Sequence, residues 1–179
     1  MTIRPARDED LDQIRAIYDA IVTDTAISFE ETTPSRDVLA RRMHSQPRLP
    51  WLVAEFEDVV GYAYAGSHRE RAAYRWSVDC SVYVAATHRE RGVGRLLLER
   101  LIDEVRDLGY VSVFAGIALP NAPSVRLHES LGFRTVGVFP SVGYKLGAWR
   151  DVGWWHLRLA PAFPGAPEEP RVWHPDHSS

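Results

Sequence analysis

The N-terminal part of the chain carries two stretches of apolar residues at helical spacing. In the first, apolar side chains recur three or four positions apart, as on one face of an amphipathic helix: Leu11, Ile14, Ile17, Tyr18, Ile21 and Val22. A short strand is predicted before it at residues 2–6, and Asp8 is predicted to be the N-cap of this helix. A second helix is predicted to begin after Ser35, its N-cap, and to end at 48–50.

The middle of the chain changes to the two-residue alternation of β-strands. Residues 51–56 and 59–65 are β-rich runs separated by two acidic residues, a pattern that predicts a hairpin. A third strand is predicted over 74–84, where apolar and polar positions alternate. Because alternate side chains leave a strand on the same side, Asp79 and Tyr83 are expected on one face of it.

The second half predicts a long helix and further strands. The helix carries a leucine-rich apolar face and ends at Gly109, which is suited to the left-handed position after a helix: Leu96, Leu97, Leu101, Ile102, Val105 and Leu108. Ser124 is predicted to cap a short helix that Gly132 closes. Three more strands are predicted at 111–117, 133–139 and 154–159. This order predicts an α+β, or mixed α/β, single sheet with helices on both faces.

Length and composition limit the classes of function. The 179 residues suffice for one domain, predicted over 1–162, and 163–179 lacks periodicity and is expected to be extended or disordered. A net charge of -3 gives no reason to expect nucleic acid or an anionic membrane as partner. No apolar run is long enough to span a bilayer, and the N-terminus has no signal-peptide pattern, so a cytoplasmic protein is expected. Cys80, the single cysteine, excludes an internal disulfide; it is interpreted as a small buried hydrophobe or, alternatively, a nucleophile.

A glycine-containing segment lies between the third strand and the long helix: Arg89-Glu90-Arg91-Gly92-Val93-Gly94-Arg95. Glycines let the backbone turn sharply, and the free amides of a first helical turn attract anions. Arg91 and Arg95 would add charge-assisted bonds to phosphate oxygens. The segment lacks the Gly-Lys-Ser/Thr ending of a Walker loop and the third glycine of a dinucleotide site. On its own it fits either a phosphate site or an ordinary turn.

The flanking segments carry a family resemblance. Ser81-Val82-Tyr83-Val84, a spacer, Arg-x-x-Gly-x-Gly and a leucine-rich helix resemble the acetyl-CoA-binding signature of the GNAT acetyltransferase superfamily. A second motif resembles its downstream pattern, with histidine in the usual tyrosine position: Asn121, Ser124, His128, Gly132 and Phe133. The resemblance covers about residues 2–160. It implies a GNAT fold with about seven mostly antiparallel strands, acetyl-CoA as co-substrate and no metal.

Further stretches resemble the phosphinothricin N-acetyltransferase group and its relatives acting on methionine sulfone and methionine sulfoximine. They include Pro50-Trp51-Leu52-Val53-Ala54-Glu55, Tyr64-Ala65-Gly66, Ala73-Tyr74, Leu119-Pro120-Asn121, Pro123-Ser124-Val125-Arg126, His128-Glu129 and the segment from Tyr144 to Gly153. This resemblance implies acetylation of the α-amino group of a small amino-acid-like compound, through a tetrahedral intermediate. It also implies a homodimer.

Three residues are candidates for the chemistry. Asp79 would accept the proton of the amine, directly or through a water, although the group usually has glutamate there. His128 would protonate the departing thiolate or act as a second proton acceptor. A main-chain N–H near Tyr83 or Val84 would bind the oxyanion. The plain alternatives are a solvated strand carboxylate for Asp79 and a packed helix histidine for His128. For Asn121, expected to bind pantetheine amides, the alternative is a loop cap before Pro123.

The substrate carboxylate is expected to pair with an arginine. Arg75, next to Tyr74, is the first candidate, and Arg69 and Arg71 are further ones, against the alternative of solvated loop arginines. Phe29 matches an aromatic position that in this group reaches the neighbouring subunit's active site, against the alternative of a core aromatic. Competing functions are a GNAT activity on a protein N-terminus, polyamine or antibiotic, and a non-catalytic acyl-CoA sensor. The arginine-rich loop favours an acidic or zwitterionic substrate over a polyamine.

Overall fold

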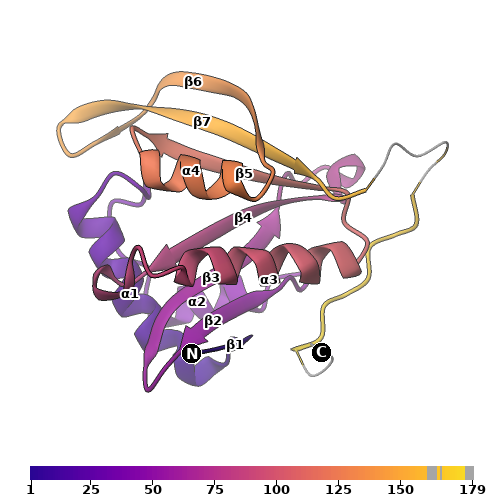
Figure 1. Ribbon diagram of the computed structural model, residues 1–179, viewed down its shortest axis with the longest axis horizontal. Coiled ribbons are helices and arrows are strands. Elements are labelled where there is room, and N and C mark those ends of the chain that lie inside the picture. Colours follow the sequence, from indigo (N-terminus) through magenta and orange to yellow (C-terminus); the bar gives the residue numbers. More distant parts are fainter. Residues whose placement is uncertain (161–164, 166, 176–179) are drawn as a thin grey trace.

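The described part of the chain forms one sheet of seven strands in the order β1-β2-β3-β4-β5-β7-β6 (Figure 1). The computed structural model describes residues 1–160, 165 and 167–175. The strands are β1 Thr2–Pro5, β2 Trp51–Glu55, β3 Val59–Ser67, β4 Ser77–Val84, β5 Ser112–Leu119, β6 Arg134–Lys145 and β7 Ala148–Arg158. Neighbouring strands are antiparallel, apart from β4 and β5, which run parallel. The predicted mixed α/β fold with one mostly antiparallel sheet is therefore confirmed.

Among the residues that the structure describes, four α-helices cover the two faces of the sheet (Figure 1). They are α1 Leu11–Asp24 and α2 Arg36–Met43 on one face, and α3 Val93–Asp107 and α4 Ala122–Ser130 on the other. Short 3₁₀ turns occur at Asp8–Asp10, Ala72–Tyr74 and Ala86–His88. Within the part of the chain that the structure describes, no helix is long and apolar enough to cross a membrane.

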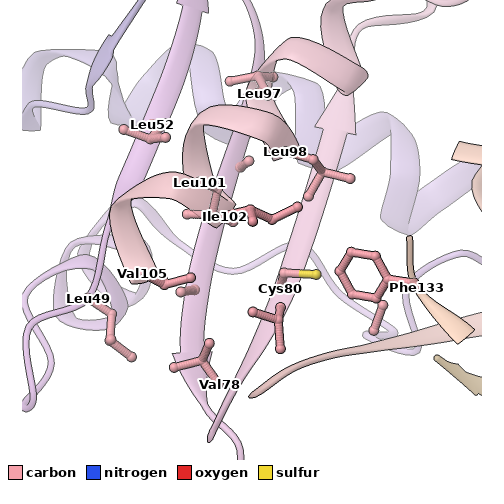
Figure 2. Packing of buried hydrophobic residues seen from close by; sticks show 14 of the residues in the cluster. Leu49, Leu52, Val78, Cys80, Leu97, Leu98, Leu101, Ile102, Val105 and Phe133 are labelled. Carbon is pink, nitrogen blue, oxygen red and sulfur yellow. The ribbon is translucent and has the colours of Figure 1, made fainter. Parts of the chain in front are cut away.

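The larger core lies between α3 and the sheet. The leucines of α3 pack over β2, β3 and β4, and Figure 2 shows Cys80 of β4 in this layer, with its sulfur on the side of Phe133. The α3 face is shifted from the predicted one, because Leu98 is fully buried whereas Leu96 is 44% exposed. The second core lies on the opposite face, where α1 and α2 cover aromatic residues of β2 and β3. The alternation predicted for β4 is confirmed, since Val78 and Cys80 belong to the first core.

Strands β4 and β5 pair over only three positions and then diverge. The pairs run from Ser77 with Ser112 to Asp79 with Phe114, although β4 continues to Val84 and β5 to Leu119. Beyond the last pair, the facing edges of the two strands have lost their ladder partners. The fold thus opens a wedge in the middle of its own sheet, with Asp79 and Phe114 at its closed end.

The C-terminal hairpin is longer than predicted. Strands over 133–139 and 154–159 were expected, whereas β6 and β7 together span nearly all of 134–158. Pro140 and several glycines hide the strand pattern, and the register shifts between Phe139 and Gly143. The main-chain N–H of Ser141, which has a φ of 49°, donates to the Asp151 carboxylate at 2.7 Å instead. A side chain therefore replaces ladder bonds at this bulge.

Several predicted element ends are wrong. Asp8 does not cap α1, because it lies in a 3₁₀ turn. The buried Asp10, at the end of this turn, accepts a hydrogen bond from the main-chain N–H of Arg7. Ser124 lies inside α4, and the N-cap is Asn121, whose side-chain oxygen accepts from the Ser124 N–H at 3.2 Å. Ser35 is the N-cap of α2 as predicted, but the helix ends at Met43, before 48–50. The strand predicted from 74 begins at Ser77, behind a 3₁₀ turn.

The described part of the tail packs on α3. Residues 167–174 contain no helix or strand, and Figure 1 shows this segment passing the C-terminal end of α3. The main-chain N–H of Arg171 donates to the Leu108 carbonyl at 2.8 Å, and Trp173 is 2% exposed. The indole N–H of Trp173 donates to Glu104 at 3.1 Å. The domain boundary predicted at 162 falls outside the described residues and stays a prediction.

Truncating Trp173 to alanine is expected to lower the free energy of unfolding by about 3 kcal/mol, because a buried indole is lost and Glu104 keeps only its contact with Arg100. Urea unfolding followed by circular dichroism measures this change. Val172→Ala is the control, since Val172 is 51% exposed in the same segment. Equal stability of the two variants would contradict a structural role for the tail.

Candidate functional site

The wedge between β4 and β5 is a narrow pocket. Its lining comes from both strands directly beyond their last pair, at 80–83 and 115–118, and from Asn121 and Ser124 at the start of α4 and His128 in its last turn. The main-chain N–H and C=O groups without ladder partners suit a ligand that has amide groups. Such a ligand can form hydrogen bonds to the strand edge as a neighbouring strand would. The predicted residues Val82 and Tyr83 line this pocket, and Val84 follows at the open end.

The predicted phosphate segment lies at the N-terminus of α3. Gly92 is the N-cap and has a φ of 81°, and Glu90 also has a positive φ of 60°, so the backbone turns sharply here. The first amides of α3 have no intrahelical acceptor, so their N–H groups are available to bind an anion. A Cβ on Gly94 would lie 3.5 Å from Leu127 of α4 and 3.6 Å from Val84 of β4. This helix end therefore borders the pocket.

The three arginines of this segment differ in their contacts. The Arg89 guanidinium donates to the Val84 carbonyl at 3.2 Å. Arg95 pairs with Glu99 at 2.8 Å and donates to the Ser130 hydroxyl at 3.0 Å. Arg91 is exposed and forms no hydrogen bond or ion pair with the rest of the described chain. Arg91 is thus the arginine of this segment with all its donors available to a ligand, and Arg89 also has no carboxylate partner among the described residues. Val93 is buried in the core.

His128 lies at the wall of the pocket and is 3% exposed. Its Nδ1 is 2.8 Å from the Ser124 carbonyl oxygen, so Nδ1 carries the hydrogen and donates. Its Nε2 then has a free lone pair, 4.0 Å from the sulfur of Cys80. Burial lowers the pKa of His128, while the bond to Ser124 raises it to a lesser extent. At neutral pH the imidazole is an acceptor through Nε2.

Cys80 is buried beside this imidazole, and its burial decides between a nucleophile and a small buried hydrophobe. Burial and, to a lesser extent, the nearby Asp79 charge together raise the pKa of its thiol to about 12. Only the thiolate is a strong nucleophile. Cys80 is therefore the small buried hydrophobe of the first interpretation.

The lowered pKa of His128 predicts a dependence of stability on pH. A buried neutral histidine binds fewer protons in the folded state than in the unfolded state. Its contribution is complete above the unfolded pKa and is lost as the pH falls towards the folded pKa. Between about pH 7.5 and pH 5, the Tm of the unmodified protein should fall about 3 °C more than that of His128→Asn. Parallel slopes in differential scanning calorimetry would contradict a buried neutral imidazole.

Asp79 lies at the closed end of the wedge and contacts a residue that the sequence analysis missed. Nδ1 of His68 is 2.6 Å from Oδ1 of Asp79, and the His68 ring stacks on Phe114 at 4.3 Å. Burial raises the pKa of Asp79, while the hydrogen bond from His68 and the charge of Arg69 lower it. The Asp79 side chain is one-third exposed. It is therefore not the solvated strand carboxylate of the plain alternative.

The register of the β3–β4 hairpin explains how His68 reaches Asp79. Gly66 is paired directly with Asp79, and His68 follows two positions later, so it lies diagonally across on the same face. Continuing the two-residue alternation of β3 past its predicted end at 65 would have found this neighbour. The hairpin pairing itself needed the structure, because the connection spans nine residues.

Tyr83 points away from the wedge, although its backbone lines it. Its ring packs against Tyr18 of α1 at 5.1 Å and Tyr62 of β3 at 5.3 Å. Burial raises the pKa of its phenol well above the usual value, so the phenol stays protonated. Any direct role of Tyr83 in the wedge therefore belongs to its main chain.

The arginines near the loop are arranged differently from the prediction. Arg75 donates through Nε to both carboxylate oxygens of Glu169, at 2.8 and 2.7 Å, and its guanidinium lies 4.0 Å above the Trp76 ring. Arg69 lies over the Trp154 ring and acts electrostatically on Asp79. The alternate candidate, Arg69, is thus the one whose charge reaches the site. Arg71 is exposed, and Tyr74 meets the edge of the His68 ring at 6.0 Å.

Phe29 packs within its own chain. Its ring covers Gly143 of β6 so closely that a Cβ at Gly143 would collide with it. The Lys145 ammonium, in the same strand, donates to the Ser28 carbonyl at 2.6 Å. Phe29 is 39% exposed, so it is not the core aromatic of the alternative interpretation. The loop between α1 and α2 is thereby held against β6, with Ile27 at the pocket.

No metal centre is evident in the described ranges 1–160, 165 and 167–175. They contain no group of three or more His, Cys, Asp or Glu residues placed to hold an ion.

Comparisons with known proteins agree with this geometry. The acetyltransferase (GNAT) domain family matches residues 3–154. Phosphinothricin N-acetyltransferase of Streptomyces viridochromogenes is 42% identical over 173 residues, covering 94% of this chain and 93% of that protein. L-methionine sulfoximine/L-methionine sulfone acetyltransferase of Salmonella typhimurium is 41% identical over 162 residues, covering 89% of this chain and 95% of that protein. Phosphinothricin acetyltransferase from Sinorhizobium meliloti, solved in complex with AcCoA, superposes with a TM-score of 0.89 at 34% identity, covering 94% and 93% of the two chains.

Proposed function

This chain belongs to the GNAT acetyltransferase family, and we propose that it transfers an acetyl group from acetyl-CoA to the α-amino group of a small amino-acid-like compound. Phosphinothricin, methionine sulfone and methionine sulfoximine represent the compound class, as in its relatives. The observation that carries the proposal is the wedge, which ends at the carboxylate of Asp79. An acyl group held between β4 and β5 would thus meet a partly exposed proton-accepting centre, in which Asp79 accepts a hydrogen bond from His68.

The residues of the wedge fit acetyl-CoA as co-substrate. The unpaired edge of β4 at 82–84 suits the amides of the pantetheine arm, and Asn121 at the pocket wall has its amide NH₂ available while its oxygen caps α4. The helix N-terminus at 92–95 suits the pyrophosphate, with Arg91 as an added positive charge. The phosphates would then lie at the open end of the wedge and the acetyl group towards the closed end.

The chemistry follows from this placement. The α-ammonium group gives up a proton to the pair formed by Asp79 and His68. The neutral amine then attacks the thioester carbon to form a tetrahedral intermediate. A main-chain N–H near Tyr83 or Val84 stabilises its oxyanion. The carbon–sulfur bond then breaks, and the sulfur takes up the second proton of the nitrogen. His128, neutral and buried with Nε2 facing the pocket, serves as the relay for this second proton.

Positive charge near Asp79 supports an acceptor that carries a carboxylate. Arg69 acts on Asp79 electrostatically and is exposed. Arg75 already binds a carboxylate, that of Glu169, through its guanidinium, although both side chains are largely exposed. Because Glu169 neutralises Arg75, Arg69 is the positive charge of this loop that favours a carboxylate over a second ammonium group. The proposed substrate class is therefore zwitterionic, with Arg69 as the nearer partner of its carboxylate.

We also propose that the protein forms a homodimer through the β6–β7 hairpin. This hairpin ends the sheet, and its exposed large apolar side chains form a contiguous set along it: Val136, Val138, Phe139, Val142, Tyr144, Leu146 and Trp149. So many exposed large apolar side chains in one terminal hairpin are typical of an interaction surface. Light scattering during size-exclusion chromatography should give twice the chain mass, and Val142→Glu should shift it towards the monomer.

A steady-state screen tests the proposed function. With acetyl-CoA as donor, kcat/KM is compared for phosphinothricin, methionine sulfone, methionine sulfoximine, ordinary amino acids, a polyamine and a short peptide. At least one of the first three should exceed the polyamine and the peptide by about 100-fold or more. A preference for the polyamine or the peptide would refute the substrate class, and binding of acetyl-CoA without any transfer would indicate a sensor.

A further inference from the structure

His68 has one nitrogen bound to a carboxylate and the other open. Because the carboxylate of Asp79 accepts hydrogen bonds, Nδ1 of His68, 2.6 Å from it, is the donor. Nε2 is then left with its lone pair. Within the described residues, Nε2 has no hydrogen-bond partner, and it is not among the polar atoms sealed from solvent. This is the arrangement in which a carboxylate orients an imidazole so that the distal nitrogen acts as a base.

The surrounding rings fix the plane of this imidazole. His68 stacks on Phe114 at 4.3 Å with an interplanar angle of 17°. The edges of Tyr74 and Trp154 approach it at 6.0 and 6.1 Å. The His68 side chain is only 12% exposed, although it lies in a surface connection between two strands. An imidazole that served only to neutralise Asp79 would not need to be held in one plane on three sides.

The imidazole of His68 also lies next to the pocket in which the acetyl group is proposed to bind. Asp79 and Phe114, its two main contacts, form the last pair between β4 and β5, and the pocket begins at the residues that follow each of them. His68 therefore stands at the closed end of the wedge, on the face that α1 and α2 cover. The charged and titratable groups near the pair are Arg69, which follows His68, Tyr74, whose ring lies edge-on to His68, Tyr64 on β3, and Cys80, whose side chain lies on the opposite face of β4. Burial raises the pKa of the Tyr64 phenol and of the Cys80 thiol, so both stay protonated and Arg69 is the charge that acts on Asp79.

We propose that His68 is the catalytic base, which takes the proton from the acceptor amine through Nε2, while Asp79 is the positioning carboxylate that holds its Nδ1–H. This deepens the proposed function and rests on it. The N–H bond of the α-ammonium group breaks, its proton passes to Nε2, and the imidazolium releases that proton to solvent after each turnover. The freed electron pair forms the carbon–nitrogen bond, and the pair of the carbon–sulfur bond leaves with the sulfur, which takes the remaining proton.

Three variants at one position separate a base from a structural contact. His68→Phe keeps a ring on Phe114 but has no nitrogen, and His68→Asn keeps a donor towards Asp79 but no basic nitrogen. His68→Ala leaves space for free imidazole. All three should lower kcat about 100-fold with the KM for acetyl-CoA within about twofold. Added imidazole should raise kcat of His68→Ala in proportion to its concentration and leave His68→Phe unchanged.

A second measurement does not depend on turnover. In the ¹⁵N-histidine NMR spectrum, assigned with His68→Phe, Nδ1 of His68 should carry the hydrogen and Nε2 should have the shift of an unprotonated nitrogen at alkaline pH. The opposite tautomer overturns the proposal. Near-normal kcat in His68→Phe, or full recovery in His68→Asn, also overturns it, since His68 would then be dispensable or would only orient Asp79.

The failure of the proposed function gives a different result. If the unmodified enzyme acetylates only polyamines or peptides, the substrate class is wrong, and the three His68 variants are compared on the amine that reacts. Loss of kcat and rescue by imidazole on that amine support the base; unchanged kcat refutes it.

Discussion

Asp79→Asn is expected to lower kcat for acetyl transfer about a thousandfold while leaving the KM for acetyl-CoA within about twofold. The amide keeps the size of the side chain and an oxygen for the His68 N–H, but it removes the negative charge beside the proton-accepting centre. A general base and its orienting carboxylate contribute about 10²- to 10⁴-fold in comparable sites. Stopped-flow or steady-state detection of released CoA thiol measures the change.

Two further variants make this result specific. Asp79→Glu retains the charge one methylene farther out and is expected to keep more activity than Asp79→Asn. Asp103→Asn removes a carboxylate from the exposed face of α3 and should leave kcat unchanged. Wild-type turnover in Asp79→Asn would remove the carboxylate from the mechanism, although it would leave the fold and family untouched.

Gly94→Asp is expected to raise the KM for acetyl-CoA about 100-fold, equivalent to about 2.7 kcal/mol of binding free energy. Its Cβ would lie between Val84 of β4 and Leu127 of α4, at the border of the wedge. The new carboxylate would therefore narrow the pocket and repel the pyrophosphate from the helix N-terminus. An aspartate in a first helical turn stabilises the helix itself, so the fold should persist.

Gly94→Ala is the matched control for size, since a methyl group meets its neighbours at ordinary contact distances. It should raise the KM for acetyl-CoA only about twofold to fivefold, by the loss of close backbone approach. Ala20→Asp, on the exposed side of α1, is the control for charge and should leave the KM for acetyl-CoA unchanged. Unchanged acetyl-CoA binding by Gly94→Asp in isothermal titration calorimetry would place the cofactor elsewhere.

The sequence predicted those parts of the site that depend on local pattern. The alternation of β4 placed Asp79 and Tyr83 on one face, and the glycines at 92 and 94 marked the beginning of α3. Both signals arise from consecutive residues, because strand alternation and helix N-termini are set by the local backbone. The residues at the start of α4 were also found, although Asn121 and not Ser124 is its cap.

Contacts between distant segments were not predictable in the same way. Glu169 forms an ion pair with Arg75, and Trp173 packs in the core beside α3, yet neither residue lies in a periodic pattern. The pairing of His68 with Asp79 depends on the register of a hairpin whose connection contains a 3₁₀ turn. In each case the two partners are far apart in the chain and come into contact only when the sheet has formed. Local patterns in a single sequence therefore do not predict the contact.

One competition measurement tests the central claim, that the acceptor is the α-amine of a carboxylate-bearing amino-acid-like compound. An equimolar mixture of methionine sulfone, its carboxamide, spermidine and a tripeptide is supplied with limiting acetyl-CoA, and the acetylated products are identified by mass spectrometry. The account predicts α-N-acetyl methionine sulfone as the main product, ahead of the carboxamide by about tenfold or more. Acetyl groups found mainly on the carboxamide, the polyamine or the peptide would contradict it.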